Sequence, residues 1–327
     1  MAVDPMAVDP MADPMTPDVR RILVGLDGSL PSREALVAAT LLAQVLEAEL
    51  EGLFVEEEIW HRVGSLMGRG VESGPVAEPG SAALVGARLI GGYTGMARPT
   101  VGEGLGRELR ALARKMALHL EEVSARASLR SRFRVERGRP EAVILLAAAD
   151  ADLVTVGRVG RSHGRAGRLG TTARTLVEKS DTPVLLLPQG ARLGGRVVVI
   201  PDGERPGGHP SPGPVSGLAL GAQLARTWEA PLLVILPRPQ GAGSASGEGG
   251  VSREERRMLE IRGQLDRMGV EDAALHLVSS LNPATLGRLL GTDQGTLVVV
   301  ERGSPLVAGE RLEGTLAALR RVAMLLV

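Results

Sequence analysis

The amino-acid sequence predicts an α/β protein of two tandem, doubly wound domains, each an open five-stranded parallel sheet with helices on both faces. Strand patterns alternate with helix patterns along the chain, which favours parallel sheets joined by right-handed crossovers. The same order of elements occurs twice in 327 residues, so each domain has enough chain to bury its own core. Hydrophobic residues make up 44% of the sequence but aromatic residues only 2%, and aliphatic runs suit strands that are buried on both faces.

The first half of the chain begins with a strand pattern at 22–26 that ends at Asp27, and an amphipathic helix follows at 33–47. Further strands are expected at 50–55, 131–135, 153–156 and 183–187, and further helices at 103–127, 141–149 and 171–180. Between 57 and 102, glycine, proline and arginine residues break this rhythm, which predicts an insertion and a candidate surface for a protein partner. These elements define a first domain at 19–190.

The second half repeats the pattern from a strand at 196–200, which ends in Pro201-Asp202-Gly203 as the first strand ends in Leu26-Asp27-Gly28. The other strands are expected at 232–236, 275–278, 297–300 and 323–327, and the helices at 215–228, 252–268 and 283–290. This pattern predicts a second domain at 191–327. Residues 1–18 repeat Met-Ala-Val-Asp-Pro, and we expect a disordered, low-complexity tail there.

The bulk composition excludes several classes of function. The chain has no cysteine, which excludes disulfides, thiol catalysis and cysteine-ligated metals and fits a reducing compartment. Lysine plus arginine and aspartate plus glutamate number 38 each, so the net charge predicts neither nucleic-acid binding nor attraction to membranes. No run approaches the ~20 apolar residues of a membrane span. The acidic, proline-containing N-terminus does not resemble a signal peptide, and we therefore expect a cytoplasmic protein.

A glycine-rich pattern follows the fourth strand of the first half. Gly157 and Gly160 are followed after nine residues by Gly170, Thr171 and Thr172, which open a helix. Glycines allow the main chain to approach a ligand closely, and the N–H groups at a helix N-terminus stabilise an anion. Open parallel sheets bind ligands beyond the carboxyl ends of their strands, where the winding reverses. The pattern therefore predicts a phosphate site at this edge, unless the loop is purely structural.

Charged side chains surround this predicted site. Arg158, Arg161, Arg165 and Arg168 lie in the same loop and favour heavily phosphorylated ligands. For each arginine, phosphate contact and a solvated surface position are both open. Asp27 ends the first strand, and it is a candidate either for ligand binding or for capping the turn that follows.

The spacing Gly-x2-Gly-x9-Gly-[Ser/Thr] at 157–171 resembles the ATP-binding signature of the universal stress protein family. The resemblance runs from Ile22-Leu23-Val24-Gly25-Leu26-Asp27-Gly28-Ser29, through Gly138-Arg139-Pro140, to Thr182-Pro183-Val184-Leu185-Leu186-Leu187-Pro188, and covers most of the first domain. It implies the strand order 3-2-1-4-5 in each domain and a pairing of the two fifth strands into an internal pseudo-dimer. The insertion departs from the family pattern.

The resemblance also implies how ATP, with or without Mg²⁺, would bind. Asp27 would bond the ribose or the adenine edge, Val55 would meet adenine through its backbone, and the glycines and threonines would hold the phosphates. The whole expected nucleotide-binding set is Asp27, Gly28, Ser29, Val55, Val156, Gly157, Arg158, Gly160, Gly170, Thr171 and Thr172. No catalytic or metal-ligating residue is predicted.

The second half differs from the first at the corresponding positions. An alignment of the fourth strands places Glu301 over Gly157, Ser304 over Gly160, and Gly314-Thr315 over Gly170-Thr171. In this alignment the spacing from the strand end to the Gly-Thr pair is the same in both halves, but Glu301 and Ser304 replace the two leading glycines. A carboxylate in place of Gly157 would repel a phosphate, so we expect a degenerate second domain that does not bind ATP.

Three functions are compatible with these features. The first is an ATP-binding cytoplasmic stress-response regulator that is read out through conformation or partners. The alternative is a nucleotide-free interaction module that regulates a partner such as a membrane transporter. An ATPase or nucleotidyl transferase ranks last, because no positioned base or metal carboxylate is found. The sequence has no Walker lysine, no Gly-x-Gly-x-x-Gly after the first strand and no Ser-Gly-Gly-x-Asp-Ser loop.

Overall fold

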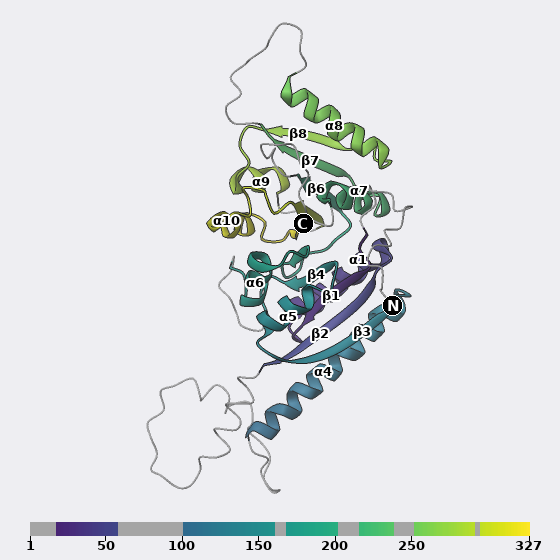
Figure 1. Cartoon of the computed structure of the whole chain (residues 1–327), viewed down its shortest axis with the longest axis vertical. Helices are drawn as coiled ribbons and strands as arrows, with labels where there is room; N and C mark the ends of the chain where they lie inside the picture. The colour runs from purple at the N-terminus through teal and green to yellow at the C-terminus, as the bar shows by residue number, and fades with distance from the viewer. Residues whose placement is uncertain (1–17, 58–100, 161–167, 202–215, 239–251, 292–294) are drawn as a thin grey trace, which may run out of the picture.

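The computed structural model describes residues 18–57, 101–160, 168–201, 216–238, 252–291 and 295–327. The strands of these segments form one continuous 10-stranded sheet in the order β3-β2-β1-β4-β5-β10-β9-β6-β7-β8. Each half of the chain has the expected order of third, second, first, fourth and fifth strand, and Figure 1 shows the two halves stacked along the long axis of the molecule. Nearly all of the expected tail and of the expected insertion lie outside the described residues.

The elements of the first half follow the predicted alternation. They are β1 (Arg21–Leu26), α1 (Leu30–Leu46), β2 (Glu49–Glu57), α4 (Val101–Arg126), β3 (Ser131–Gly138), α5 (Pro140–Ala148), β4 (Leu153–Gly157), α6 (Thr171–Lys179) and β5 (Val184–Leu187). Strands β2 and β3 are longer than predicted because they pair in parallel as far as Glu57 opposite Gly138. At the two ends of the expected insertion, Glu57 belongs to β2, and residues 101–102 belong to α4.

The elements of the second half repeat this order. They are β6 (Arg196–Ile200), α7 (Gly217–Thr227), β7 (Leu232–Pro237), α8 (Arg253–Arg267), β8 (Ala274–Val278), α9 (Pro283–Leu290), β9 (Thr296–Val300), α10 (Glu310–Ala318) and β10 (Ala323–Leu326). None of the helices in the described segments is long and apolar enough to cross a membrane.

Local sequence explains where several helices begin. The Ser29 hydroxyl accepts a hydrogen bond from the amide of Ser32 and caps α1, whose first turn also contains a proline. Ser252 and Glu255 form a reciprocal capping box at the start of α8. Asn282 caps α9 immediately before Pro283. These capping signals are local in sequence and stabilise the observed helix starts.

The two halves are joined by their fifth strands. Strand β10 pairs antiparallel with β5, with Met324 opposite Leu186 and Leu326 opposite Val184. All four of these residues are fully buried. The predicted pairing of the fifth strands is confirmed, and it covers two apolar sheet edges that would otherwise be exposed.

The buried core is divided by the faces of the sheet. Residues of α1, α4, α7 and α8 form one cluster, and residues of α5, α6, α9 and α10 form the other, on opposite sides of the strands (Figure 1). Each cluster contains side chains from both halves, such as Leu42 with Leu220 in one and Leu176 with Leu316 in the other. The two halves therefore share both clusters, because a continuous sheet offers one continuous surface on each face.

Candidate functional site

A cavity of about 700 Å³ lies at the carboxyl ends of β1, β2, β3 and β4. Strand β1 lies between β2 and β4, so the winding of the sheet reverses at this point, and this is the expected place for a ligand of an open parallel sheet. The volume falls within the ~300–1,000 Å³ usual for small-molecule sites. Nine of the expected residues line it: Asp27, Ser29, Val55, Val156, Gly157, Gly160, Gly170, Thr171 and Thr172.

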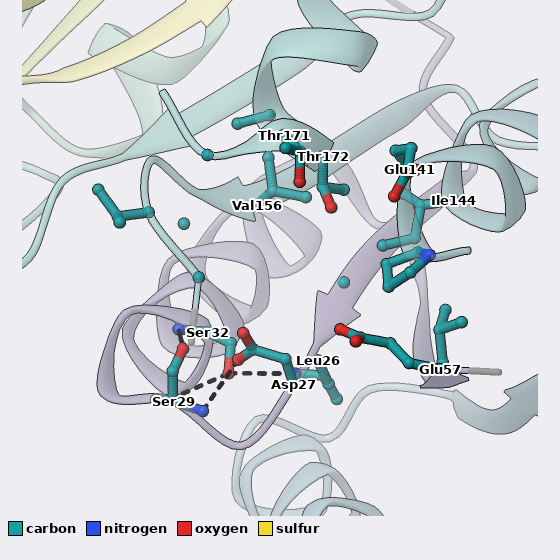
Figure 2. A pocket seen from close by; sticks show the side chains of 18 of the residues that line it. Leu26, Asp27, Ser29, Ser32, Glu57, Glu141, Ile144, Val156, Thr171 and Thr172 are labelled. Atoms are coloured by element: carbon teal, nitrogen blue, oxygen red, sulfur yellow. Dashed lines mark hydrogen bonds between the residues drawn. The ribbon is translucent and has the colours of Figure 1, made fainter. Parts of the chain in front are cut away.

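Asp27 has one carboxylate oxygen in the turn after β1 and the other toward the cavity. Its Oδ1 accepts a hydrogen bond from the amide of Ser29 at 2.9 Å, so the capping interpretation is correct for this oxygen. Its Oδ2 lies 3.0 Å from the position that a Cβ atom on Gly160 would occupy. Figure 2 shows the Asp27 side chain at the rim of the cavity beside these turn contacts. The aspartate therefore both shapes the turn and faces the loop.

The glycines leave space that side chains would fill. A Cβ atom on Gly157 would lie 2.8 Å from Cβ of Pro31 and 3.3 Å from the carbonyl oxygen of Val159. A Cβ atom on Gly170 would lie 3.4 Å from the amide nitrogen of Gly160. The two ends of the loop thus approach each other through main-chain atoms. Bare backbone of this kind allows an anion to approach closely.

Helix α6 points its N-terminus at the same cavity. Gly170 is the N-cap residue and has no side chain with which to cap the first-turn N–H groups. Thr171 and Thr172 follow, and Figure 2 shows their hydroxyl groups on the cavity side of the helix. The helix dipole and two hydroxyl donors favour an anion at this end of the cavity.

The opposite wall contains residues that the sequence analysis missed. Glu57 at the end of β2 and Glu141 in the first turn of α5 line the cavity, together with Arg139. Figure 2 shows both glutamate side chains extending into the same space. The signal was available, because the segment from Gly138 to Glu141 follows a parallel strand, and all such strand ends meet at one edge. Nowhere in the described residues do three or more acidic or histidine side chains form a group that would hold a metal ion.

Two expected residues do not line the cavity. Gly28 has a φ of +80°, and a Cβ atom there would lie 2.6 Å from Leu112 of α4, so the turn and the packing require this glycine. Arg158 turns its guanidinium away from the cavity and is buried against the second half, where it donates to the carbonyl oxygens of Leu316, Leu319 and Val322. The expectation that Arg158 contacts phosphate is therefore wrong for its side chain.

The other loop arginines contribute little to the described site. Arg168 lies 3.8 Å from Glu313 of α10, and Arg174 of α6 donates to the same carboxylate at 2.6 Å. Neither arginine lines the cavity. Arg161 and Arg165 lie outside the described residues.

The second half has a different arrangement at the same place. The Glu301 side chain packs on the main chain of Gly217 at the start of α7, with its Cγ 3.2 Å from where a Cβ atom of Gly217 would lie. In the first half, Gly157 at the end of β4 packs against Pro31 of α1. In the second half the glycine is instead in the helix, and the larger residue, Glu301, follows the strand. Beside the strand end, the Glu301 side chain thus takes the place that Pro31 has in the first half.

The alignment of Gly314-Thr315 with Gly170-Thr171 was wrong in structural terms. Helix α10 begins at Glu310, so Gly314 and Thr315 lie in its second turn and not at its N-terminus. The Thr315 residue is fully buried, and its Oγ1 lies 2.9 Å from the carbonyl oxygens of both Leu306 and Arg311, which share its one hydroxyl proton. The linking segment 301–309 is shorter than 158–170, which moves the helix start relative to the glycine.

Comparisons with known proteins agree with this fold. The model of the universal stress protein family matches residues 18–188. A universal stress protein from Archaeoglobus fulgidus is 15% identical, covers 95% of this chain and 97% of its own, and has a TM-score of 0.59. A functionally unknown Pseudomonas aeruginosa protein is 17% identical, with 94% and 92% covered and a TM-score of 0.54. A putative universal stress protein from Pseudomonas aeruginosa is 17% identical, with 94% and 93% covered and a TM-score of 0.53. A search of curated proteins found no significant match.

Proposed function

The chain belongs to the universal stress protein family, and on that premise we propose that its first half binds ATP in the cavity at the carboxyl edge of the sheet. The observation that carries the proposal is the meeting of Gly157, Gly160 and the uncapped start of α6 at one end of this cavity. That end would receive the phosphates through main-chain N–H groups and the hydroxyls of Thr171 and Thr172. If Mg²⁺ is present, the ion would neutralise part of the negative charge of the phosphates.

The remaining parts of the cavity support a nucleoside at the other end. Val55 and Val156, at the ends of β2 and β4, provide apolar surface for a base. Asp27 offers an acceptor for a ribose hydroxyl. Glu57 and Glu141 add carboxylate acceptors suited to the exocyclic amino group of adenine.

We propose that the second half does not bind ATP. Glu301 replaces the leading glycine with a carboxylate, and the buried Thr315 hydroxyl already has main-chain carbonyl partners. A phosphate placed there would meet a carboxylate and would gain no threonine donor.

We further propose that the protein is a cytoplasmic regulator in which bound ATP is read out through conformation or partner choice. Binding, and not turnover, is the function assigned to the site. The alternative is an interaction module that works without a nucleotide. Acid release and chromatography of nucleotides from freshly purified protein separates the two, because only the first predicts a co-purified adenine nucleotide or its uptake on addition.

A direct test is calorimetric titration of ATP into wild type and into a Thr171→Val/Thr172→Val variant. The substitutions keep side-chain shape and remove both hydroxyl donors, so we expect ATP affinity to fall at least about tenfold. Thr285→Val is the matched control, since Thr285 occupies the first turn of α9 in the second half, and it should bind ATP like wild type. No saturable heat with wild type at millimolar ATP would contradict the proposal.

A further inference from the structure

The main chain of Arg158 joins the parts of the phosphate-binding loop. Its amide donates to the carbonyl oxygen of Leu187 at the end of β5, at 2.8 Å. Its carbonyl oxygen accepts a hydrogen bond from the amide of Gly170, the N-cap residue of α6, also at 2.8 Å. The position of Arg158 therefore sets the distance between the glycines after β4 and the start of α6.

The side chain of the same residue is held by the second half of the chain. Its Nη1 donates to the carbonyl oxygens of Leu319 at 2.7 Å and Leu316 at 3.2 Å, and its Nη2 donates to Val322 at 2.6 Å. These carbonyls belong to the end of α10 and the turn after it, where a cation is favoured by the helix dipole. The residue is only 6% exposed. Burial lowers the pKa of Arg158 to about 9, so the guanidinium remains charged at neutral pH.

Arg302 is the counterpart of Arg158 in the second half. Its amide donates to the carbonyl oxygen of Val327 at 2.9 Å, beyond the end of β10. Its guanidinium crosses back to the first half and donates to the carbonyl oxygens of Val177 at 2.9 Å and Thr182 at 2.8 Å. The two arginines are thus related by the pseudo-twofold symmetry of the sheet. Of these two arginines, Arg158 also accepts a hydrogen bond from Gly170 through its main-chain carbonyl, at the start of helix α6, which faces the cavity.

We propose that Arg158 is a positioning residue through which the second half holds the phosphate-binding end of the first half in shape. The inference rests on the proposed function and goes beyond it by giving the degenerate half a role in ligand binding. Arg158 itself touches no ligand in this account. It acts through Gly170, whose main chain lies against Gly160.

The physical reason is the rigidity that phosphate binding needs. Main-chain N–H groups bind a phosphate well only when they already point at it, and a shift of about 1 Å in such a site has large effects. A loop tied only by its own backbone would have freedom to separate from α6. The three hydrogen bonds from the Arg158 guanidinium to carbonyl oxygens at the end of α10 and in the turn after it remove that freedom. The guanidinium itself lies outside the cavity.

The test compares Arg158→Met with Arg302→Met in the full chain. Each variant replaces an arginine that reaches across to main-chain carbonyls of the other half, Arg158 being buried and Arg302 half-buried, so both should lower the stability of the protein. ATP and adenosine are titrated into each, because adenosine lacks the phosphates that the loop is proposed to hold. We expect Arg158→Met to weaken ATP binding at least about tenfold more than adenosine binding. Arg302→Met should change the two affinities by similar, small factors.

The outcomes separate this inference from the proposed function. If wild type binds neither ATP nor adenosine, both proposals are wrong. If wild type binds ATP but Arg158→Met loses ATP and adenosine equally, or behaves like Arg302→Met, only the positioning role is wrong. If Arg158→Met fails to fold, Arg158→Lys is tested instead. Lysine keeps the positive charge but cannot bond all three carbonyls as the guanidinium does, so the same selective loss of ATP affinity is expected. A Lys variant with the wild-type ratio of ATP to adenosine affinity overturns the inference.

Discussion

Asp27 and Gly160 face each other so closely that a Cβ atom on Gly160 would lie 3.0 Å from Oδ2 of Asp27. The first strand and the loop after the fourth strand therefore meet at a point where only glycine leaves the carboxylate in place. In the proposed complex this carboxylate contacts the nucleoside.

Gly160→Ala is expected to move the Asp27 carboxylate and to weaken ATP binding about tenfold, or about 1.4 kcal/mol. Gly160 is exposed, so the free energy of unfolding should change by less than about 1 kcal/mol. Calorimetric titration and urea unfolding measure the two quantities. Gly263→Ala is the control, because this glycine of α8 has open space around its Cβ position. Unchanged ATP affinity in Gly160→Ala would contradict the proposed role of the Asp27–Gly160 approach.

Gly157→Ala is expected to destabilise the fold itself. Its Cβ atom would lie 2.8 Å from Cβ of Pro31 and 3.3 Å from the Pro31 carbonyl carbon, so α1 or the strand end must shift. Overpacking of this kind costs about 1–3 kcal/mol, which urea unfolding would detect. Gly170→Ala meets only ordinary contacts from 3.4 Å and should lower the unfolding free energy less. Equal losses in the two variants would show that Pro31 does not set the space around Gly157.

The contact between Arg174 and Glu313 predicts a pH-dependent link between the halves. The hydrogen bond from Arg174 holds the pKa of Glu313 below its ordinary value of 4.5. Since the folded pKa is lower than the unfolded one, the contact stabilises fully above pH 4.5, and this contribution is lost as the pH falls through the lowered pKa. The difference in unfolding free energy between wild type and Glu313→Gln should therefore shrink toward zero in acid. A difference that stays constant from pH 7 to pH 3 would contradict this assignment.

Glu301→Gly should fail to create a second nucleotide site. The substitution restores the leading glycine, but Thr315 remains buried in the second turn of α10, bonded to Leu306 and Arg311. The number of ATP molecules bound per chain, measured by equilibrium dialysis, should be the same as in wild type. An increase by one would show that Glu301 alone keeps ATP out.

Much of the architecture could be predicted from local sequence. Aliphatic runs, helix periodicity and turn residues placed the strands and helices near their observed bounds, and Pro31, Asn282 and Pro283 lie at helix starts. The strand order and the pairing of β5 with β10 came from the family resemblance, because strand pairing is a long-range property that local patterns do not encode. The sharing of each core cluster by both halves follows from that pairing, but the sequence analysis did not predict it.

The errors at the site have one physical source, which is packing between distant segments. The spacing of Gly314 and Thr315 copies that of Gly170 and Thr171, yet the start of α10 depends on how its linking segment packs. Arg158 is next to a cavity-lining glycine in sequence, and its direction is set by carbonyls at the end of α10 and in the turn after it. Neither the start of α10 nor the direction of the Arg158 side chain can be predicted from the adjacent residues in the sequence.

The central claim is that one half of the chain binds ATP and the other does not. Equilibrium dialysis of the purified full chain against labelled ATP tests it most directly, after any bound nucleotide has been removed. The account predicts saturation at one ATP per chain, with loss of that binding in the Thr171→Val/Thr172→Val variant. Saturation at two per chain, or no binding at millimolar ATP, would contradict it.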